Sequence, residues 1–263
     1  MATQSVWWPE VSTEIQEFVE KCPICARHQA QGAEPLITTP IPQLPWPKLA
    51  ADFFELNGQP YLLVVDYYSK YVEVTYMSTM SCRQTINHFR SIFARHGIPE
   101  ELTTDNGPQF TSEEFANFAA EPRFQHFTSS PRFPQANGLA ERTVKSLKQL
   151  FSTSKDPWSA LLAYRSTPLE SGFSPAELLF NRKIQSTVPV TRESRRPRIP
   201  NSNRFRERVT NIQLRLEKNF NERHKSVSQP LLSPGHPVFL PDRQESGHIV
   251  SSPATRSYLI STP

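Results

Sequence analysis

Three acidic residues occupy positions where a carboxylate has no ordinary surface role. Asp52 lies inside an apolar strand-like segment, Asp105 follows a second such segment, and Glu141 falls in the first turns of a predicted helix. Carboxylates that converge repel one another at neutral pH, so a cluster of them needs bound cations. Mg²⁺ prefers a few carboxylate oxygens plus waters, and a pair of such ions clamps the attacking and leaving oxygens of a phosphoryl displacement. If the fold brings these residues together, the sequence predicts a site for metal-dependent phosphoryl transfer.

Each acid also has a simpler explanation when it is taken alone. Asp105 precedes Asn106-Gly107 and could cap a turn, and Glu141 could favour the helix dipole. Asp52 is harder to explain in this way, because an unpaired charge within a strand is costly. Asp66 looks similar to Asp52, but its position at the second turn of a predicted meander favours a capping role.

The first strands that must position these acids form a predicted antiparallel meander. Strand-like segments cover residues 49–56, 61–67 and 71–76. The first two are joined across Asn57-Gly58, which is a strong hairpin signal. Asp52 is therefore expected in the first strand of a sheet.

Helical and strand-like segments alternate after the meander. Apolar spacing predicts a helix over 83–96 that stops at Gly97, followed by strands over 101–104 and 124–128. Further helices are predicted over 10–21, from the capping box Thr111–Glu114 to Ala120, over 137–152 and 158–164, after the capping box Ser174–Glu177, and over 204–224. The pattern predicts an α/β domain with a mixed sheet and helices packed on it.

The charge distribution divides the chain into two parts. Residues 1–180 carry a net charge of −5, whereas residues 181–263 carry +9. A basic extension suits a polyanionic partner, because contacts to phosphates release counterions, although a solvated surface on a partly disordered tail would have the same composition. The longest apolar run, 61–65, is far too short to cross a bilayer, so no membrane partner is expected.

Two motifs in the sequence resemble a known family of enzymes. Thr104-Asp-Asn-Gly-Pro-Gln-Phe110 and Ser129-Ser-Pro-Arg-Phe-Pro-Gln-Ala-Asn-Gly-Leu-Ala-Glu-Arg142 resemble the integrase of gypsy-type long-terminal-repeat retrotransposons and, more distantly, retroviral integrases. The 35 residues between Asp105 and Glu141 match the spacing of that family's Asp, Asp-35-Glu triad, and Asp52 falls in a segment that looks like its first catalytic strand. The resemblance extends over most of residues 7–183.

The resemblance implies a ribonuclease H-like core with a five-stranded mixed sheet. That core would bind two Mg²⁺ or Mn²⁺ ions through Asp52, Asp105 and Glu141. Water would first hydrolyse a phosphodiester near each end of the element's DNA, and the freed 3′-hydroxyl would then attack target DNA. The implied partners are element-end DNA, target DNA and further copies of the chain in a homo-oligomer on DNA, and the implied location is the nucleus. Arg195-Arg-Pro-Arg198 is too short to count as a targeting signal.

Basic residues follow Glu141 on the same predicted helix. Lys145 and Lys148 lie four and seven residues past Glu141, on its face, where they could meet a DNA phosphate. In the family, matching lysines contact element-end DNA, and the alternative is a solvated basic face. Gln135 and Asn137, just before this helix, are further candidates for DNA contact.

The sequence departs from the family pattern at both ends. Cys22 and Cys25 have the spacing of half a zinc site, but no histidine precedes Val6, so we expect a degenerate half-site and no bound zinc. Strands expected at 238–240, 248–251 and 257–260 cover part of the family's SH3-like barrel. The expected domains are 1–45, a remnant of the zinc-binding region with a Pro-rich connector; 46–183, the catalytic core; 184–230, a basic linker and helix; and 231–263, a partial SH3-like domain.

These departures leave a second function open. The leading hypothesis is an integrase that carries out 3′-end processing and strand transfer of element DNA into target DNA. The alternative is a catalytically silent, host-retained nucleic-acid-binding protein derived from an integrase. A plain ribonuclease H-type nuclease is a third reading, and the long resemblance outside the triad argues against it.

Overall fold

The computed structural model describes residues 8–21, 35–121, 123–128, 138–154, 156–198, 201–226, 231–240, 245–254 and 257–262. The chain forms two compact units, one of residues 39–212 and one of residues 1–38 together with 213–263. Each unit has its own sheet. The domain limits expected from the sequence stay a prediction.

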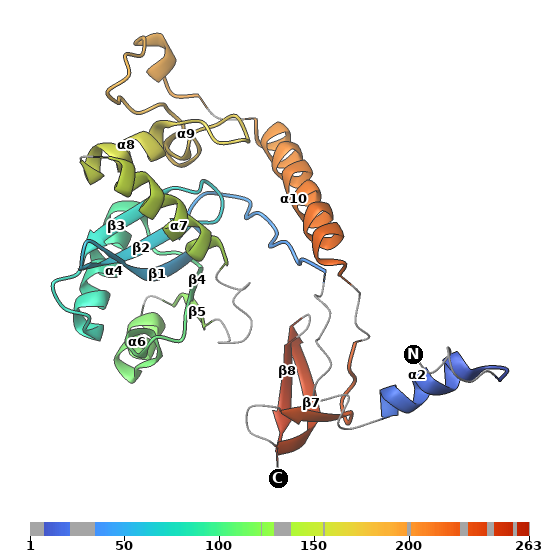
Figure 1. The fold of residues 1–263 in the computed structure, drawn as a ribbon. Helices are drawn as coiled ribbons and strands as arrows, with labels where there is room; N and C mark the ends of the chain where they lie inside the picture. The colour runs from blue at the N-terminus through green and yellow to red at the C-terminus, as the bar shows by residue number, and fades with distance from the viewer. Residues whose placement is uncertain are drawn as a thin grey trace. The chain divides into compact units, whose positions relative to one another are not determined.

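The first unit is built on a mixed five-stranded sheet with the order β3-β2-β1-β4-β5 (Figure 1). The strands β1, β2 and β3 form the predicted antiparallel meander, whereas β4 and β5 run parallel to β1. Asn57 and Gly58 have φ angles of 51° and 74°, as a tight turn between twisted strands requires. The strands span Lys48–Leu56 (β1), Gln59–Asp66 (β2), Val72–Tyr76 (β3), Glu101–Thr104 (β4) and Gln125–Thr128 (β5). The predicted hairpin and mixed sheet are confirmed.

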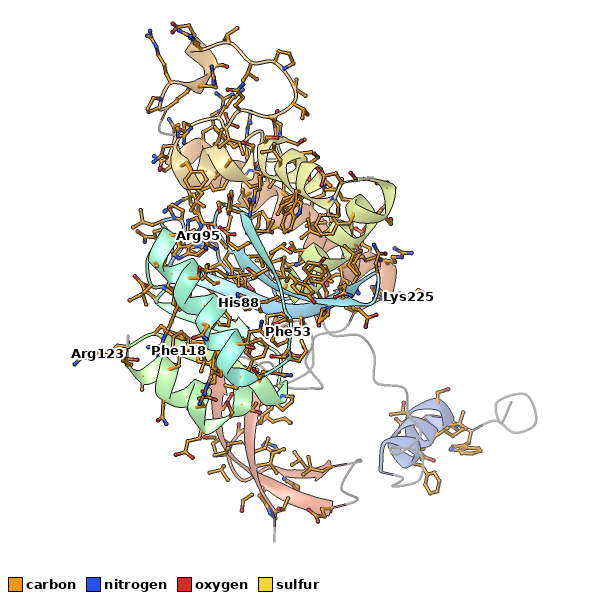
Figure 2. The ribbon with its side chains drawn as sticks, turned by 90° about the vertical axis from the view of Figure 1, so that its left-hand side faces the viewer. Phe53, His88, Arg95, Phe118, Arg123 and Lys225 are labelled. Carbon is orange, nitrogen blue, oxygen red and sulfur yellow. The ribbon has the colours of Figure 1, made fainter. Side chains whose placement is uncertain are left out.

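Helices cover both faces of this sheet. Helices α4 (Cys82–His96) and α6 (Glu113–Ala120) pack on one face through an aromatic-rich cluster that includes Phe118 (Figure 2). Helices α7 (Gly138–Thr153) and α8 (Pro157–Ser166) pack on the other face. Both faces of the central strand β1 are therefore covered by helices, so its apolar residues are buried on both sides.

Alternation along β1 decides which face each residue meets. Leu49 and Ala51 belong to the cluster beneath α4 and α6, whereas Ala50 and Phe54 belong to the cluster beneath α7 and α8. Successive side chains of a strand point to opposite faces. Asp52 therefore lies on the α7 face of the sheet.

One helix start differs from the prediction. The helix expected to begin at the Thr111 capping box begins one residue later, because Ser112 is the N-cap and its Oγ accepts from Phe115 N at 3.2 Å. A separate short helix, α5 (Pro108–Thr111), ends at Thr111, and Thr111 Oγ1 donates to Gly107 O. The second predicted capping box is confirmed at α9 (Pro175–Phe180), where Ser174 and Glu177 cap each other.

Helix α10 (Ser202–His224) begins in the first unit, where Phe205 is buried against Tyr68 and Phe173. The second unit contains α2 (Val11–Lys21) and an antiparallel sheet of β6 (Pro237–Leu240), β7 (Glu245–Ala254) and β8 (Ser257–Ser261). This three-stranded sheet fits a C-terminal piece of the kind that the sequence predicted. None of the helices in the described part of the chain has both the length and the apolarity that a bilayer span requires.

Candidate active site

Asp52 lies within β1, and Asp105 directly follows β4, the neighbouring parallel strand. The register pairs Ala50 of β1 with Thr103 of β4, and each acid lies two residues beyond its member of that pair. Neighbouring strands are about 4.8 Å apart, and residues two apart share a face. The sheet therefore brings these two acids side by side on its α7 face, and both are half-buried.

The backbone after β4 holds the carboxylate of Asp105 in a tight turn. Gly107 N donates to Asp105 Oδ1 at 3.1 Å, and the hydroxyl of the buried Thr104 donates to the main-chain oxygen of Asp105 at 2.8 Å. A Cβ at Gly107 would lie 3.1 Å from Asp105 Oδ1. The turn that the sequence suggested as an alternative role for Asp105 is therefore present, and it orients the carboxylate beside Asp52.

Helix α7 places its polar face next to these acids. Ala140, Val144 and Leu147 are buried against the sheet, as the predicted apolar stripe requires. Glu141, Lys145 and Lys148 are exposed along an adjacent stripe of the same helix. The helix is therefore amphipathic, with Glu141 on the side that borders the sheet's acidic pair.

The pKa of Asp52 reports how these groups act on one another. The pKa of Asp52 is raised to about 6, chiefly by burial, then by the carboxylate of Asp105 and, more weakly, by that of Glu141. The amide of Phe53 and the ammonium of Lys148 lower it. All three acids and Lys148 therefore share one electrostatic environment, in which a negative charge on Asp52 is disfavoured.

The carboxylates of Asp52, Asp105 and Glu141 do not form a compact three-ligand metal site in this structure. Among the residues that the structure describes, no three His, Cys, Asp or Glu side chains are grouped closely enough to hold a metal ion. Of the two neighbouring carboxylates, Glu141 has the weaker effect on Asp52. Asp105 therefore acts on Asp52 more strongly than does Glu141, which lies at the start of α7.

The chemistry of the donor set nevertheless fits a hard divalent cation. The three side chains offer carboxylate oxygens, the ligands that Mg²⁺ and Mn²⁺ prefer. A cation next to Asp52 would also relieve the like-charge repulsion that raises its pKa. Asp52 comes from a strand of the sheet, and Asp105 from a turn that is held by a hydrogen bond from Gly107 N, so both candidate ligands lie on ordered backbone.

Several other candidates lie outside this region. Gln135, Asn137, Cys22 and Cys25 fall outside the described residues. Asp66 is fully buried and has a structural task, as the sequence suggested: its carboxylate accepts hydrogen bonds from the amides of Trp46, Tyr68 and Ser69 and from the Ser69 hydroxyl. This loop cap is separate from the pair on the sheet.

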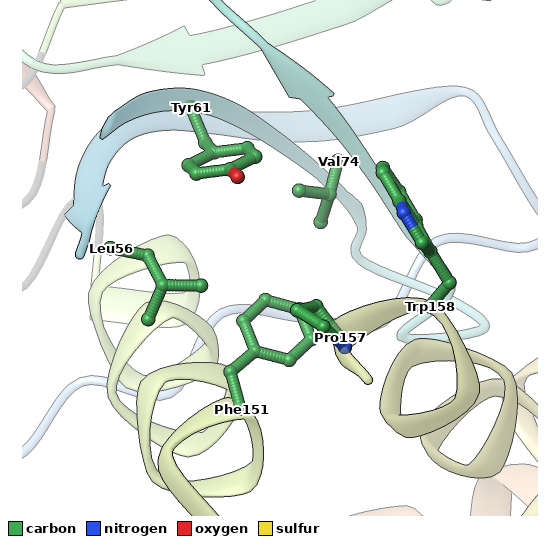
Figure 3. Close-up of a pocket in the computed structure, with 6 residues that line it drawn as sticks. All are labelled: Leu56, Tyr61, Val74, Phe151, Pro157 and Trp158. Atoms are coloured by element: carbon green, nitrogen blue, oxygen red, sulfur yellow. The ribbon is translucent and has the colours of Figure 1, made fainter. Parts of the chain in front are cut away.

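Two features of the region were not predicted from the sequence. Asn106-Gly107 signalled a turn, but nothing in the pattern indicated that Gly107 would lie against the carboxylate of Asp105. A small apolar pocket of about 50 Å³ also opens beneath Trp158 (Figure 3). It is lined by Leu56, Tyr61, Val74, Phe151, Pro157 and Trp158, so no carboxylate of the candidate site contributes to it.

Comparisons with known proteins connect this geometry to a family. Residues 45–134 match the family model of the integrase core domain. The chain is 35% identical over 201 residues to an uncharacterized protein of Caenorhabditis elegans. This match covers 72% of this chain and 16% of that protein. It is 31% identical over 165 residues to the Transposon Tf2-3 polyprotein of Schizosaccharomyces pombe, with 57% and 12% covered. It is 30% identical over 139 residues to the Gag-Pro-Pol polyprotein of Simian retrovirus SRV-1, with 51% and 8% covered.

The chain thus spans between 8% and 16% of the length of these relatives. The fold is similar to that of a chain in the cryoEM structure of the simian T-cell lymphotropic virus intasome in complex with PP2A regulatory subunit B56 gamma. The match covers 73% of this chain and 73% of that chain, with a TM-score of 0.55 and 22% sequence identity. At that identity the likeness concerns the fold. The five-stranded sheet and its helices have the ribonuclease H-like fold of an integrase catalytic core, and the chain is homologous to retroviral and retrotransposon polyproteins over their integrase core domain.

Proposed function

We propose that this chain is the integrase of a retrotransposon and that it processes the 3′ ends of element DNA and joins them to target DNA. The observation that carries the proposal is the pair formed by Asp52 in β1 and Asp105 just after the parallel strand β4, whose charges act on each other. The match of residues 45–134 to the integrase core domain supports it. The two motifs around Asp105 and Glu141 further support the gypsy-type subclass and a catalytic core over residues 46–183.

In this proposal Asp52, Asp105 and Glu141 hold two Mg²⁺ or Mn²⁺ ions. When bound, such ions supply Lewis-acid stabilisation of the oxygens that attack and leave phosphorus. The chain's own residues hold and orient the site: Gly107 N fixes one oxygen of Asp105, and helix α7 carries Glu141 towards the sheet. The nucleophile comes from water or from a DNA hydroxyl, so the protein needs no nucleophilic side chain of its own.

Lys148 gives the proposed site a contact for the substrate. Its ammonium lies close enough to Asp52 to lower that group's pKa, and it is exposed. A phosphate bound between Lys148 and the carboxylates would be held at the edge of the acidic pair. Lys145, one turn earlier on the same exposed stripe, is proposed to contact the DNA further along.

The partners follow from the reaction. Element-end DNA and target DNA are the proposed substrates, and joining two ends requires at least two copies of the chain on the DNA. The proposed location is the nucleus, where the target DNA lies. The intasome structure described above belongs to a different protein. For this chain, we include a homo-oligomer on DNA in the proposal.

A strand-transfer assay tests the proposal. Purified chain, Mg²⁺ or Mn²⁺ and duplexes with the element's terminal sequence should yield joined products in a target plasmid. Asp105→Asn should reduce product formation to background, because it removes one charge of the pair without changing its shape. Glu55→Gln makes the same chemical change at an exposed position of β1 and should leave the activity unchanged. Equal product from the wild type and Asp105→Asn would contradict the assignment.

One observation favours a second function. Because the described carboxylates are not grouped closely enough to hold a metal ion as they stand, the chain could bind nucleic acid without reacting. In that case DNA binding would be independent of divalent metal, and neither hydrolysis nor joining would be detected with Mg²⁺ or Mn²⁺. Metal-dependent joining by the wild type would exclude this alternative.

A further inference from the structure

The loop that follows α9 concentrates positive charge outside the candidate active site. Residues 181–198 follow α9 as a loop (Figure 1), and a hydrogen bond from Arg198 N to Asn181 O joins its two ends. The loop contains one acidic residue, Glu193, and six basic residues: Arg182, Lys183, Arg192, Arg195, Arg196 and Arg198. All six side chains are exposed or half-exposed. This is a compact cationic surface within the first unit.

Hydrogen bonds hold this loop in one shape. Arg198 N donates to Asn181 O at 2.7 Å and closes the loop at its base, where Asn181 adopts the left-handed conformation with φ 55°. Across the loop, Arg195 Nη1 donates to Gln185 Oε1 at 2.6 Å. A short 3₁₀ turn, η2 (Glu193–Arg195), closes with a bond from Arg196 N to Glu193 O. The cationic groups are therefore carried on an ordered scaffold, which lowers the entropy lost when a ligand binds.

Much of this charge has no internal counter-ion. Arg196 pairs with Glu193 at 3.0 Å, and Lys183 lies 3.9 Å from Glu177. In the part of the chain that the structure describes, Arg182, Arg192 and Arg198 have no acidic partner within salt-bridge distance.

Arg195 adds a donor whose bonding is incomplete. Its Nε is buried and has no hydrogen-bond partner among the described residues, although its Nη1 is bonded to Gln185. A buried donor without a partner calls for an explanation, and an absent ligand is one of the ordinary ones.

We propose that loop 181–198 binds the phosphate backbone of nucleic acid as a second contact surface, separate from the carboxylates and from α7. Five of its six cations are arginines, whose planar forks match phosphate oxygens in a bidentate way. The loop lacks any aromatic side chain, so it has little with which to insert into a lipid interface. The inference rests on the proposed function in taking DNA as the polyanion.

Salt dependence of DNA binding tests the loop directly. The full chain is titrated onto a fluorescent duplex in EDTA between 50 and 200 mM salt, so that binding is measured without catalysis. Arg182→Gln/Arg192→Gln/Arg198→Gln should lower the slope of log K against log salt by about 2.7, because each lost phosphate contact removes about 0.9. The matched control Arg83→Gln/Arg90→Gln/Arg123→Gln removes equal charge elsewhere and should keep the wild-type slope, since Arg83 and Arg90 are offset by Glu114 and Glu121.

A charge-preserving variant guards against loss of structure. Arg182→Lys/Arg192→Lys/Arg198→Lys should keep the wild-type slope and bind DNA more weakly, because lysine keeps the charge and loses the fork. An unchanged slope in the glutamine variant would overturn the proposal, as would equal losses in the loop and control variants. Loss of binding to phosphatidylserine vesicles with unchanged DNA binding would overturn it in favour of a membrane contact.

Failure of this inference can be told apart from failure of the proposed function. If the wild type joins no DNA but the glutamine variant of the loop has a lower slope of log K against log salt, the catalytic proposal fails and the loop proposal stands. If strand transfer occurs and depends on Asp105, but the loop variant has the wild-type slope of log K against log salt, only the loop proposal fails.

Discussion

Asp52 and Asp105 are 53 residues apart in the chain, yet Asp52 lies in β1 and Asp105 directly follows β4, the strand that pairs in parallel with β1. The parallel pairing of β1 with β4 creates this relationship, because both strands end in the same direction and present residues of equal register on the same face. The two strands are fixed by packing on both sides, beneath α4 and α6 on one face and α7 on the other. The position of Asp52 is therefore a property of the sheet, and that of Asp105 depends on the sheet and on the turn that follows β4.

Asp52 is predicted to cost the metal-free protein stability. Because burial and the neighbouring carboxylates raise its pKa to about 6, the ionised form is disfavoured in the fold at neutral pH. Asp52→Asn should therefore raise the free energy of unfolding by about 1 kcal/mol in EDTA at pH 7.5, a value reduced from the full pKa shift because the group is partly exposed to solvent. The same variant should be inactive in strand transfer. A lower stability for Asp52→Asn would contradict the raised pKa.

The pH dependence of that difference follows from linkage. The unfolded chain releases the proton of Asp52 near the ordinary aspartate pKa of 3.8, whereas the pKa of about 6 in the fold means that the folded chain holds it longer. The wild type and Asp52→Asn should therefore differ little below pH 4, and the variant's advantage should grow as the pH rises through 4 to 6 and then stay constant. Urea unfolding at a series of pH values measures this difference. A difference that is independent of pH would show that the carboxylate is not titrating in this range.

Bound divalent metal is predicted to offset the loss of stability that ionised Asp52 causes in the metal-free protein. An ion that binds only the folded state should raise Tm by roughly 5 to 10 °C at a hundred times its Kd. Thermal melting with Mg²⁺, Mn²⁺ or EDTA measures this shift. Glu141→Gln should weaken the shift, whereas Glu55→Gln should keep it. An equal shift in both variants would mean that Glu141 is not a ligand.

Gly107 is predicted to support Asp105. Its φ of −58° suits any residue, but an added Cβ would lie 3.1 Å from Asp105 Oδ1 and 3.2 Å from Gln109 Oε1. Gly107→Ala should therefore displace the carboxylate and reduce strand transfer by about tenfold or more, with little change in Tm. Gly138→Ala is the matched control for stability, because nothing lies within 4 Å of its added Cβ. Full activity in Gly107→Ala would show that the position of this carboxylate tolerates the crowding.

Replacement of Asp66 is predicted to destabilise the fold, whereas replacement of Asp52 is predicted to stabilise it. It is fully buried, but its oxygens accept bonds from the amides of Trp46, Tyr68 and Ser69. Asp66→Ala would leave these buried donors without partners and should cost about 3 kcal/mol or more of the free energy of unfolding. Glu55→Ala, at an exposed position, should change it by less than about 0.5 kcal/mol. Denaturant unfolding of both variants checks the contrast, and a neutral Asp66→Ala would refute the capping role.

Local chemistry in the sequence was enough to predict most of the elements. Asn57-Gly58 predicted the hairpin because both residues accept a positive φ, and Gly97 predicted the end of α4 for a related reason. The capping box at Ser174 was predicted from residue types that bond within one turn. At Thr111 the same reasoning was wrong by one residue, because Pro108 starts a separate short helix that competes for this position.

The sequence by itself determined the residue types, their spacing and the face of α7 on which Glu141, Lys145 and Lys148 lie, because helical and strand periods are local properties. Only the tertiary structure decided that β1 pairs in parallel with β4, which Asp105 follows, and that Gly107 lies against the Asp105 carboxylate. It also decided that the basic residues after α9 form a closed loop. These relationships depend on contacts between segments that are distant in the chain, and such contacts are set by packing and hydrogen bonding in the fold, which no local pattern encodes.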